Sequence, residues 1–319
     1  MLDNHGVIAL PLAAAGLVAA LWRSGGGVTA ADPWIERFAL AGVSGLSIIC
    51  ILASVLATAS ILTAPILALC CGLLAVAIWL RAGPKQRPKA PPVGPGFWLC
   101  LSLVIIGLGL RYPLLPADLG GRDQGTYALR AMHTARTGGT QLHARSLAEA
   151  SVEVGFRPGP GDILGLTPLI SKRHPRAGFY DGPYRPGFYL ADREHGTVVP
   201  QFLHGHPSLL AAAELALGPG RGPSVLYLYA LLSILVVWSL ARRLWPGWMA
   251  ATFATGTYVS TPIVIWVHRV PLTESFAGLL VLATALVCIR ERDRRESHGQ
   301  TQNQNQGLDE GNNPTLDQS

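Results

Sequence analysis

The chain of 319 residues is half apolar, has only 14% charged residues and has a mean hydropathy of +0.34. Several windows approach the roughly 20 apolar residues that cross a bilayer, which indicates an integral membrane protein. The formal net charge of +6 does not indicate a nucleic-acid partner, because the basic residues lie mostly beside hydrophobic segments, where they report orientation. The five cysteines lie inside apolar runs without metal-ligand spacing, and we interpret them as small buried side chains.

The hydrophobic pattern predicts an all-α, polytopic bundle of about seven transmembrane helices with a large extracytoplasmic loop. The predicted spans are residues 7–22, 38–58, 61–80, 97–115, 224–241, 248–267 and 272–290. The domain organisation follows from them. Residues 1–81 form three amino-terminal spans, 82–96 a basic, proline-rich linker, 97–290 a second membrane region that contains the loop 116–223, and 291–319 a disordered polar tail.

Three basic clusters predict one orientation. Arg81, Lys85, Arg87 and Lys89 mark the linker as cytoplasmic, and the pair after the fifth span and the four arginines of "RERDRRE" fall on the same side. We therefore expect a multi-pass protein of the plasma (inner) membrane, with its amino terminus outside and its carboxyl terminus in the cytoplasm.

The outer loop is too long to be a plain connector, so we expect elements of its own. Residues 123–136 have helical character and are followed by two glycines. Residues 188–190 are expected to pair with 198–199 in a hairpin across a Glu-His-Gly turn. Residues 206–217 are expected to form an amphipathic helix at the outer interface.

An acid, a phenol and a cation meet on one predicted helix face, because Tyr127 and Arg130 follow Asp123 at i+4 and i+7. Such a group suits acid-base chemistry at the mouth of the membrane region. The alternative is that Asp123 only caps the helix and that Arg122 anchors the chain to lipid phosphate.

The order of these features resembles the amino-terminal half of the GT-C superfamily of membrane glycosyltransferases. An exit span is followed by "GRDQGTYALRA", a large outer loop, "HGHPSLLAAAELALG", an inward span, an outward span ending "STPIVIWVHR" and then "PLTESFAGLLVLATAL". The resemblance is greatest to the family 39, protein-mannosyltransferase and aminoarabinose-transferase-like group, and it covers residues 97–290.

The resemblance implies transfer of a sugar from a polyprenyl-phosphate donor to an extracytoplasmic acceptor, with Asp123 as the general base. Cations near the outer face are then expected to hold the phosphate, and His204, His206, Arg122 and Arg269 are the candidates. Tyr127 and Arg130 complete the expected substrate site. Glu274 occupies the place of a second acid in relatives, and a direct role and a pairing with Arg269 are equally supported.

Some features depart from that pattern. Gln124 follows Asp123 where relatives often have a second acid, so we expect neither a metal nor another cofactor. Relatives usually continue through further spans, so the alternative function is a non-catalytic fragment or scaffold subunit of the same fold that binds polyprenyl lipid. A second membrane subunit that completes the enzyme is the third arrangement. The expected partners are therefore the lipid-linked sugar, membrane lipid and such a subunit.

Overall fold

A computed structural model describes residues 4–24, 33–82, 94–115, 122–143, 145–146, 149, 188–192, 195–200 and 202–311. The helices are α1 (Asn4–Ser24), α2 (Pro33–Thr58), α3 (Ala64–Arg81), α4 (Pro95–Gly109), α5 (Arg122–Thr137), α7 (Gly205–Leu217), the short 3₁₀ helix η1 (Gly222–Ser224), α8 (Val225–Leu244), α9 (Trp248–Ser260), α10 (Pro262–Val267) and α11 (Thr273–Gly311). The strands are β1 (Leu142–His143), β2 (Phe188–Asp192) and β3 (Thr197–Pro200).

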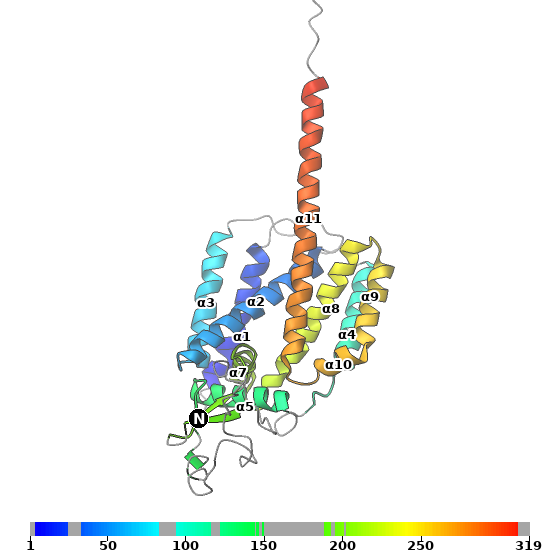
Figure 1. Cartoon of the computed structure of the whole chain (residues 1–319). Coiled ribbons are helices and arrows are strands. Elements are labelled where there is room, and N and C mark those ends of the chain that lie inside the picture. The colour runs from blue at the N-terminus through cyan, green and yellow to red at the C-terminus, as the bar shows by residue number, and fades with distance from the viewer. Residues whose placement is uncertain are drawn as a thin grey trace, which may run out of the picture.

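The long apolar helices run side by side in one bundle (Figure 1). Within the described ranges, α2, α3, α8 and α11 are long and apolar enough to cross a membrane, and α1 and α4 are shorter apolar helices. Large apolar side chains such as Ile51, Leu69, Leu73 and Val281 are more than 60% exposed on the outside of the bundle. Such a surface is unfavourable in water and suits contact with lipid. The structure therefore supports the predicted all-α class and the expectation that several helices can cross a membrane.

Helix α8 forms the centre of the bundle. It packs against α2, α4, α9 and α11, and its side chains supply much of the buried core, including Tyr229 and Trp238. The close packing depends on small residues, because a Cβ at Gly107 of α4 would lie 2.5 Å from the Ile234 side chain of α8.

The predicted span 248–267 differs from the structure, because two helices occupy it. Helix α9 ends at Ser260 and α10 begins at Pro262. Proline lacks a backbone N–H and pushes the residue before it out of the helical region, and Thr261 accordingly has ψ of 120°. The predicted exit span is also shorter than expected, since α4 ends at Gly109.

Helix α11 extends beyond its predicted end and projects past the rest of the bundle (Figure 1). The composition predicted a disordered tail from residue 291, but the helix continues to Gly311. Elongating an existing helix adds one hydrogen bond per residue fixed, and glutamine and glutamate are good helix formers. The apolar first half of α11 therefore provides a helix on which the polar segment continues.

A layer of short elements covers one end of the bundle. Helix α5 confirms the helix predicted at 123–136, and Gly138 follows it with a φ of +77°. The predicted hairpin is also confirmed, because Tyr189 pairs with Val199 and Leu190 with Val198 in antiparallel register. The structure adds β1 as a third strand beside β3, in the order β1-β3-β2.

Helix α7 is present where a helix was predicted, but it is enclosed by other helices and does not lie on the surface as an amphipathic helix. It packs against α1, α2, α3 and α5, and the residues of its first half are buried. Alanines at 211 and 212 allow neighbouring helices to approach closely, which explains how a short helix is enclosed on several sides. The helix therefore connects the covering layer to the bundle.

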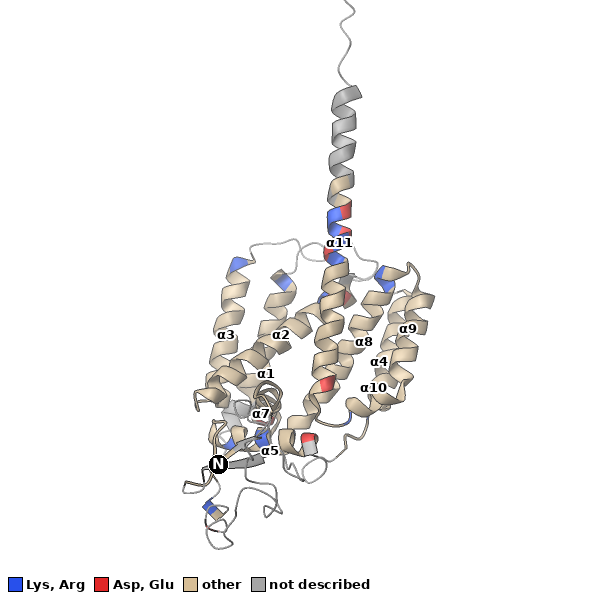
Figure 2. Cartoon of the chain, in the orientation of Figure 1, with Lys and Arg blue, Asp and Glu red and all other residues tan. Residues whose placement is uncertain are grey.

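Basic residues collect at the opposite end of the bundle (Figure 2). Arg23, Arg81, Arg242 and Arg243 all lie in the last turns of their helices. Below, this end is called the basic end, and the end that carries α5, α7 and the strands is called the covered end.

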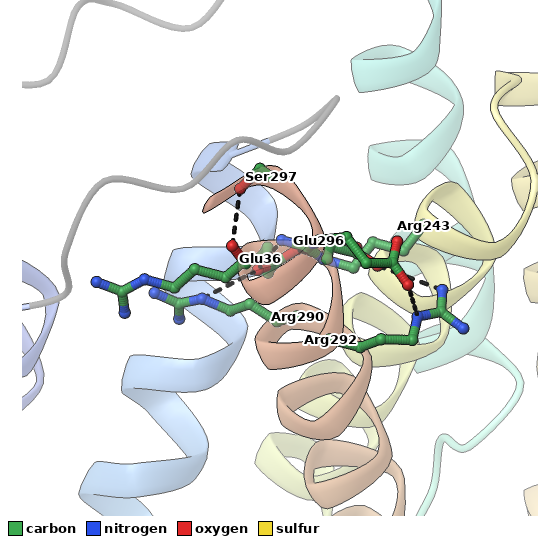
Figure 3. Close-up of polar contacts among 8 residues, drawn as sticks. Glu36, Arg243, Arg290, Arg292, Glu296 and Ser297 are labelled. Carbon is green, nitrogen blue, oxygen red and sulfur yellow. Dashed lines mark hydrogen bonds and ion pairs between the residues drawn. The ribbon is translucent and has the colours of Figure 1, made fainter. Parts of the chain in front are cut away.

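An ion-pair network joins three helices at the basic end (Figure 3). Arg243 of α8 donates to both carboxylate oxygens of Glu36 of α2, at 2.6 and 2.8 Å, and to Asp293 of α11 at 2.7 Å. Arg290 lies 4.0 Å from Glu36. The Glu36 side chain is only 2% exposed, so this bidentate pair is shielded from solvent.

Candidate functional site

Six of the eight predicted site residues lie at the covered end in three segments. Asp123, Tyr127 and Arg130 come from α5, His204 and His206 from the start of α7, and Glu274 from the first turn of α11. These six residues are called the α5 cluster below. The Arg122 side chain lies outside the described residues, and Arg269 is turned to the backbone, donating from Nε to the Pro113 carbonyl at 3.0 Å.

Tyr127 lies at the centre of the α5 cluster. Its ring is 5% exposed and packs on Phe202, with ring centroids 5.0 Å apart, and against His206 at 5.4 Å. Burial raises the pKa of its phenol, and the nearby carboxylates of Asp123 and Glu274 act in the same direction. The Thr273 side chain and the Arg130 guanidinium oppose that shift. Both acids therefore lie near one phenol.

Arg130 ties α5 to the segment before α7. It is 3% exposed and donates from Nη1 to the carbonyls of Phe202 at 2.6 Å and Leu203 at 3.2 Å. Its Nη2 contacts Nδ1 of His204. Burial lowers the pKa of Arg130 to about 10, so the guanidinium remains charged at neutral pH. Its first role is therefore to position the loop that carries both histidines.

His204 is held in one tautomer by that contact. Burial, together with the positive charge of Arg130, lowers the pKa of His204, so the ring is neutral at neutral pH. Because Arg130 donates to Nδ1, the ring proton of the neutral form lies on Nε2. The half-buried His204 thus presents a hydrogen-bond donor, which suits a phosphate oxygen.

His206 is the more deeply buried of the two histidines. Nδ1 lies 3.3 Å from the Tyr229 hydroxyl, and Tyr229 stacks on Phe276 of α11. Burial lowers the pKa of His206 to about 4, against a smaller opposing effect of the Pro271 carbonyl. Nε2 makes no hydrogen bond of normal geometry within the described part of the chain. This neutral ring connects α5, α7, α8 and α11.

The two carboxylates lack partners among the described residues. Asp123 is half-buried in the first turn of α5 and makes neither an ion pair nor a side-chain hydrogen bond there. Glu274 is exposed and has only a 3.4 Å contact from its neighbour Thr273. It does not pair with Arg269, so the structural alternative for Glu274 is not observed. The α5 cluster therefore holds two accessible acids beside a cation and two neutral histidines.

Several residues of this site escaped the sequence analysis. Thr273 and Phe202 contact Tyr127, Tyr229 reaches His206 from the interior of a span, and Phe276 stacks on Tyr229. The position of Thr273 beside Glu274 in "PLTES" was the only available signal. In the described ranges no group of three potential metal ligands comes together.

Comparison with known proteins gives no assignment. No protein-family model, curated protein or solved structure matches the chain.

Proposed function

We propose that the chain is a membrane glycosyltransferase that moves a sugar from a polyprenyl-phosphate donor to an extracytoplasmic acceptor. The observation that carries the proposal is the grouping at the covered end of an unpaired carboxylate, Asp123, with a second acid and with hydrogen-bond donors. The proposal includes the seven-span topology in the plasma membrane, with the basic end in the cytoplasm and the covered end outside.

In this reaction Asp123 acts as the general base. It accepts the proton of the acceptor hydroxyl as that oxygen bonds to the anomeric carbon of the sugar, and the bond from this carbon to the phosphate oxygen breaks. Polyprenyl phosphate leaves with the bonding electron pair. A carboxylate that is half-buried and unpaired within the described chain is suited to this role, because no described side-chain cation forms an ion pair with it.

The departing phosphate gains negative charge and needs donors more than it needs an acid. His204 offers Nε2–H, and Arg130 fixes its tautomer and contributes positive charge from behind the ring. Arg122 and Arg269 are further candidates, the latter through the guanidinium nitrogens that do not contact Pro113. Tyr127 lies near both acids, and in this proposal Glu274 contacts sugar hydroxyls.

Transfer of a radiolabelled sugar tests the proposal. The full chain is reconstituted in liposomes that contain a labelled polyprenyl-phosphate hexose, with membrane extract as the source of acceptor. Asp123→Asn keeps the size of the side chain but cannot act as a base, so transfer is expected to fall by about 100- to 10,000-fold.

Glu149→Gln is the matched control, since it removes a carboxylate of the same covered end that is 65% exposed and that pairs, among the described residues, with Arg145. It is expected to keep wild-type transfer. Equal rates for wild type and Asp123→Asn would overturn the role of Asp123, and a folded wild type without transfer would favour the non-catalytic, lipid-binding alternative.

A further inference from the structure

A second polar group, separate from the α5 cluster, lies where α4 and α10 end. Arg111 follows the last turn of α4 and is fully buried, at 0% exposure. Its Nη1 donates to the Gly107 carbonyl at 2.7 Å. Its Nε and Nη2 are buried and have no hydrogen-bond partner in the described part of the chain. Arg111 also makes no ion pair with any described carboxylate.

His268 is the second member of this group. It is 2% exposed, follows α10, and bonds through Nδ1 to the Val264 carbonyl at 2.8 Å. Its Nε2 is buried without a partner among the described residues. Arg111 lies close enough to His268 to oppose protonation of its ring. Two hydrogen bonds hold these segments together. The Leu115 N–H donates to the Arg269 carbonyl at 2.8 Å, and the Arg269 side chain donates from Nε to the Pro113 carbonyl at 3.0 Å.

A buried guanidinium with two nitrogens that lack hydrogen-bond partners among the described residues is expected to bind an anion. Leaving a charge unpaired away from water is costly, and natural structures rarely leave buried donors unsatisfied. The two free nitrogens of Arg111 are adjacent on one planar group, which matches two oxygens of a phosphate. The neutral His268 donates Nδ1–H to a carbonyl, so Nε2 is left as an acceptor for a protonated phosphate oxygen or another hydroxyl.

The surroundings of the group favour a lipid as the source of that phosphate. Leu110, Tyr112, Ile263 and Trp266 flank Arg111 and His268 in the chain and are 43 to 75% exposed. Apolar and aromatic side chains that face outward at a helix end are typical of the bilayer interface, which is the depth of lipid headgroups. We propose that Arg111 and His268 bind the phosphate group of a membrane lipid at this end of the bundle.

Thermal unfolding in a phosphate-free maltoside detergent tests this site independently of sugar transfer. Dioleoyl phosphatidate is added to the purified full chain, and dioleoylglycerol, which has the same acyl chains without phosphate, is added in parallel. A ligand that binds the folded state at about 100 times its Kd is expected to raise the Tm by roughly 5 °C. Dioleoylglycerol is expected to leave the Tm unchanged.

Two variants and one control locate the effect. Arg111→Met keeps the bulk of the side chain and removes the charge, so it is expected to lose the phosphatidate shift. Without added lipid its Tm is expected to equal or exceed that of wild type, because an unpaired buried charge is gone. His268→Gln, a second variant in case Arg111→Met does not fold, is expected to reduce the shift by half or more. Arg81→Met, at the basic end, is expected to keep it.

The outcomes separate cleanly. Retention of the full shift by Arg111→Met and by His268→Gln, or an equal shift with dioleoylglycerol, would overturn the site. An equal shift with inorganic phosphate at the same concentration would support phosphate binding but overturn its assignment to lipid.

Discussion

At the basic end, the buried charges are paired, whereas at the covered end they are not. Glu36, Arg243 and Asp293 satisfy one another across three helices at distances of 2.6 to 2.8 Å. Asp123 and Arg111 have no oppositely charged partner among the described residues. Paired charges hold helices in register, whereas an unpaired charge is costly unless a ligand uses it. The contrast fits a structural role for the basic end and the proposed chemistry at the covered end.

The largest expected change in unfolding free energy concerns the ion pairs of the basic end. Glu36→Gln leaves Arg243 buried with one partner fewer, and we expect the free energy of unfolding to fall by about 3–5 kcal/mol. Asp123→Asn makes the same chemical change at the covered end and is expected to alter it by less than about 0.5 kcal/mol. Unfolding in mixed micelles with increasing SDS measures both. Similar losses for the two variants would contradict the contrast.

Acid is expected to weaken the covered end through its buried histidine. The pKa of His206 is about 4 in the folded chain and about 6.5 when unfolded, so the unfolded state binds more protons between these values. Stability is therefore full above pH 6.5 and falls as the pH is lowered toward 4. Between pH 7 and pH 5 the expected loss is about 2 kcal/mol.

His206→Gln is expected to remove that part of the pH dependence, which unfolding curves at pH 7 and pH 5 measure. His268, with a pKa of about 4 for the same reason, contributes separately and persists in this variant. An unchanged pH dependence in His206→Gln would show that the ring is not the titrating group.

A smaller loss of unfolding free energy is expected when the guanidinium group of Arg130 is replaced. Arg130→Lys keeps the charge, but a single ammonium cannot reach the Phe202 carbonyl, the Leu203 carbonyl and His204 together. We expect a loss of about 1 kcal/mol in unfolding free energy and a larger loss in sugar transfer, because His204 is released from its tautomer. Full transfer by this variant would contradict the positioning role.

The smallest expected effect sets the baseline. Arg145 and Glu149 form a 3.0 Å pair, but their side chains are 93% and 65% exposed. Such pairs contribute roughly 0–1 kcal/mol, so Glu149→Gln is expected to change the unfolding free energy by less than about 0.5 kcal/mol. A loss as large as that of Glu36→Gln would show that burial does not separate the two pairs.

Local periodicity was enough to predict much of the fold. The helix at 123–136 and the hairpin could be predicted because a 3.6-residue period and a local turn are properties of neighbouring residues. The sequence did not predict that other helices surround α7, since an alanine-rich helix fits an interface and a packed core equally well. Which helix surrounds it depends on distant segments.

The same limit applies to the site. Asp123, Tyr127 and Arg130 were predicted together because one helix carries them. The contacts of Tyr127 with Thr273 and of His206 with Tyr229 join segments more than 20 residues apart, and a single sequence contains no signal for them. Arg111 was missed because an arginine near a helix end resembles an ordinary interfacial anchor, and only the structure reveals that its nitrogens are enclosed.

One unbroken helix, α11, carries both Glu274 at the covered end and Asp293 at the basic end. Their separation of 19 positions along the chain corresponds to roughly 28 Å at the α-helical rise. A rigid rod cannot move at one end alone. We therefore expect a tilt of α11 at Glu274 to change the Arg243–Asp293 contact on the far side of the bundle.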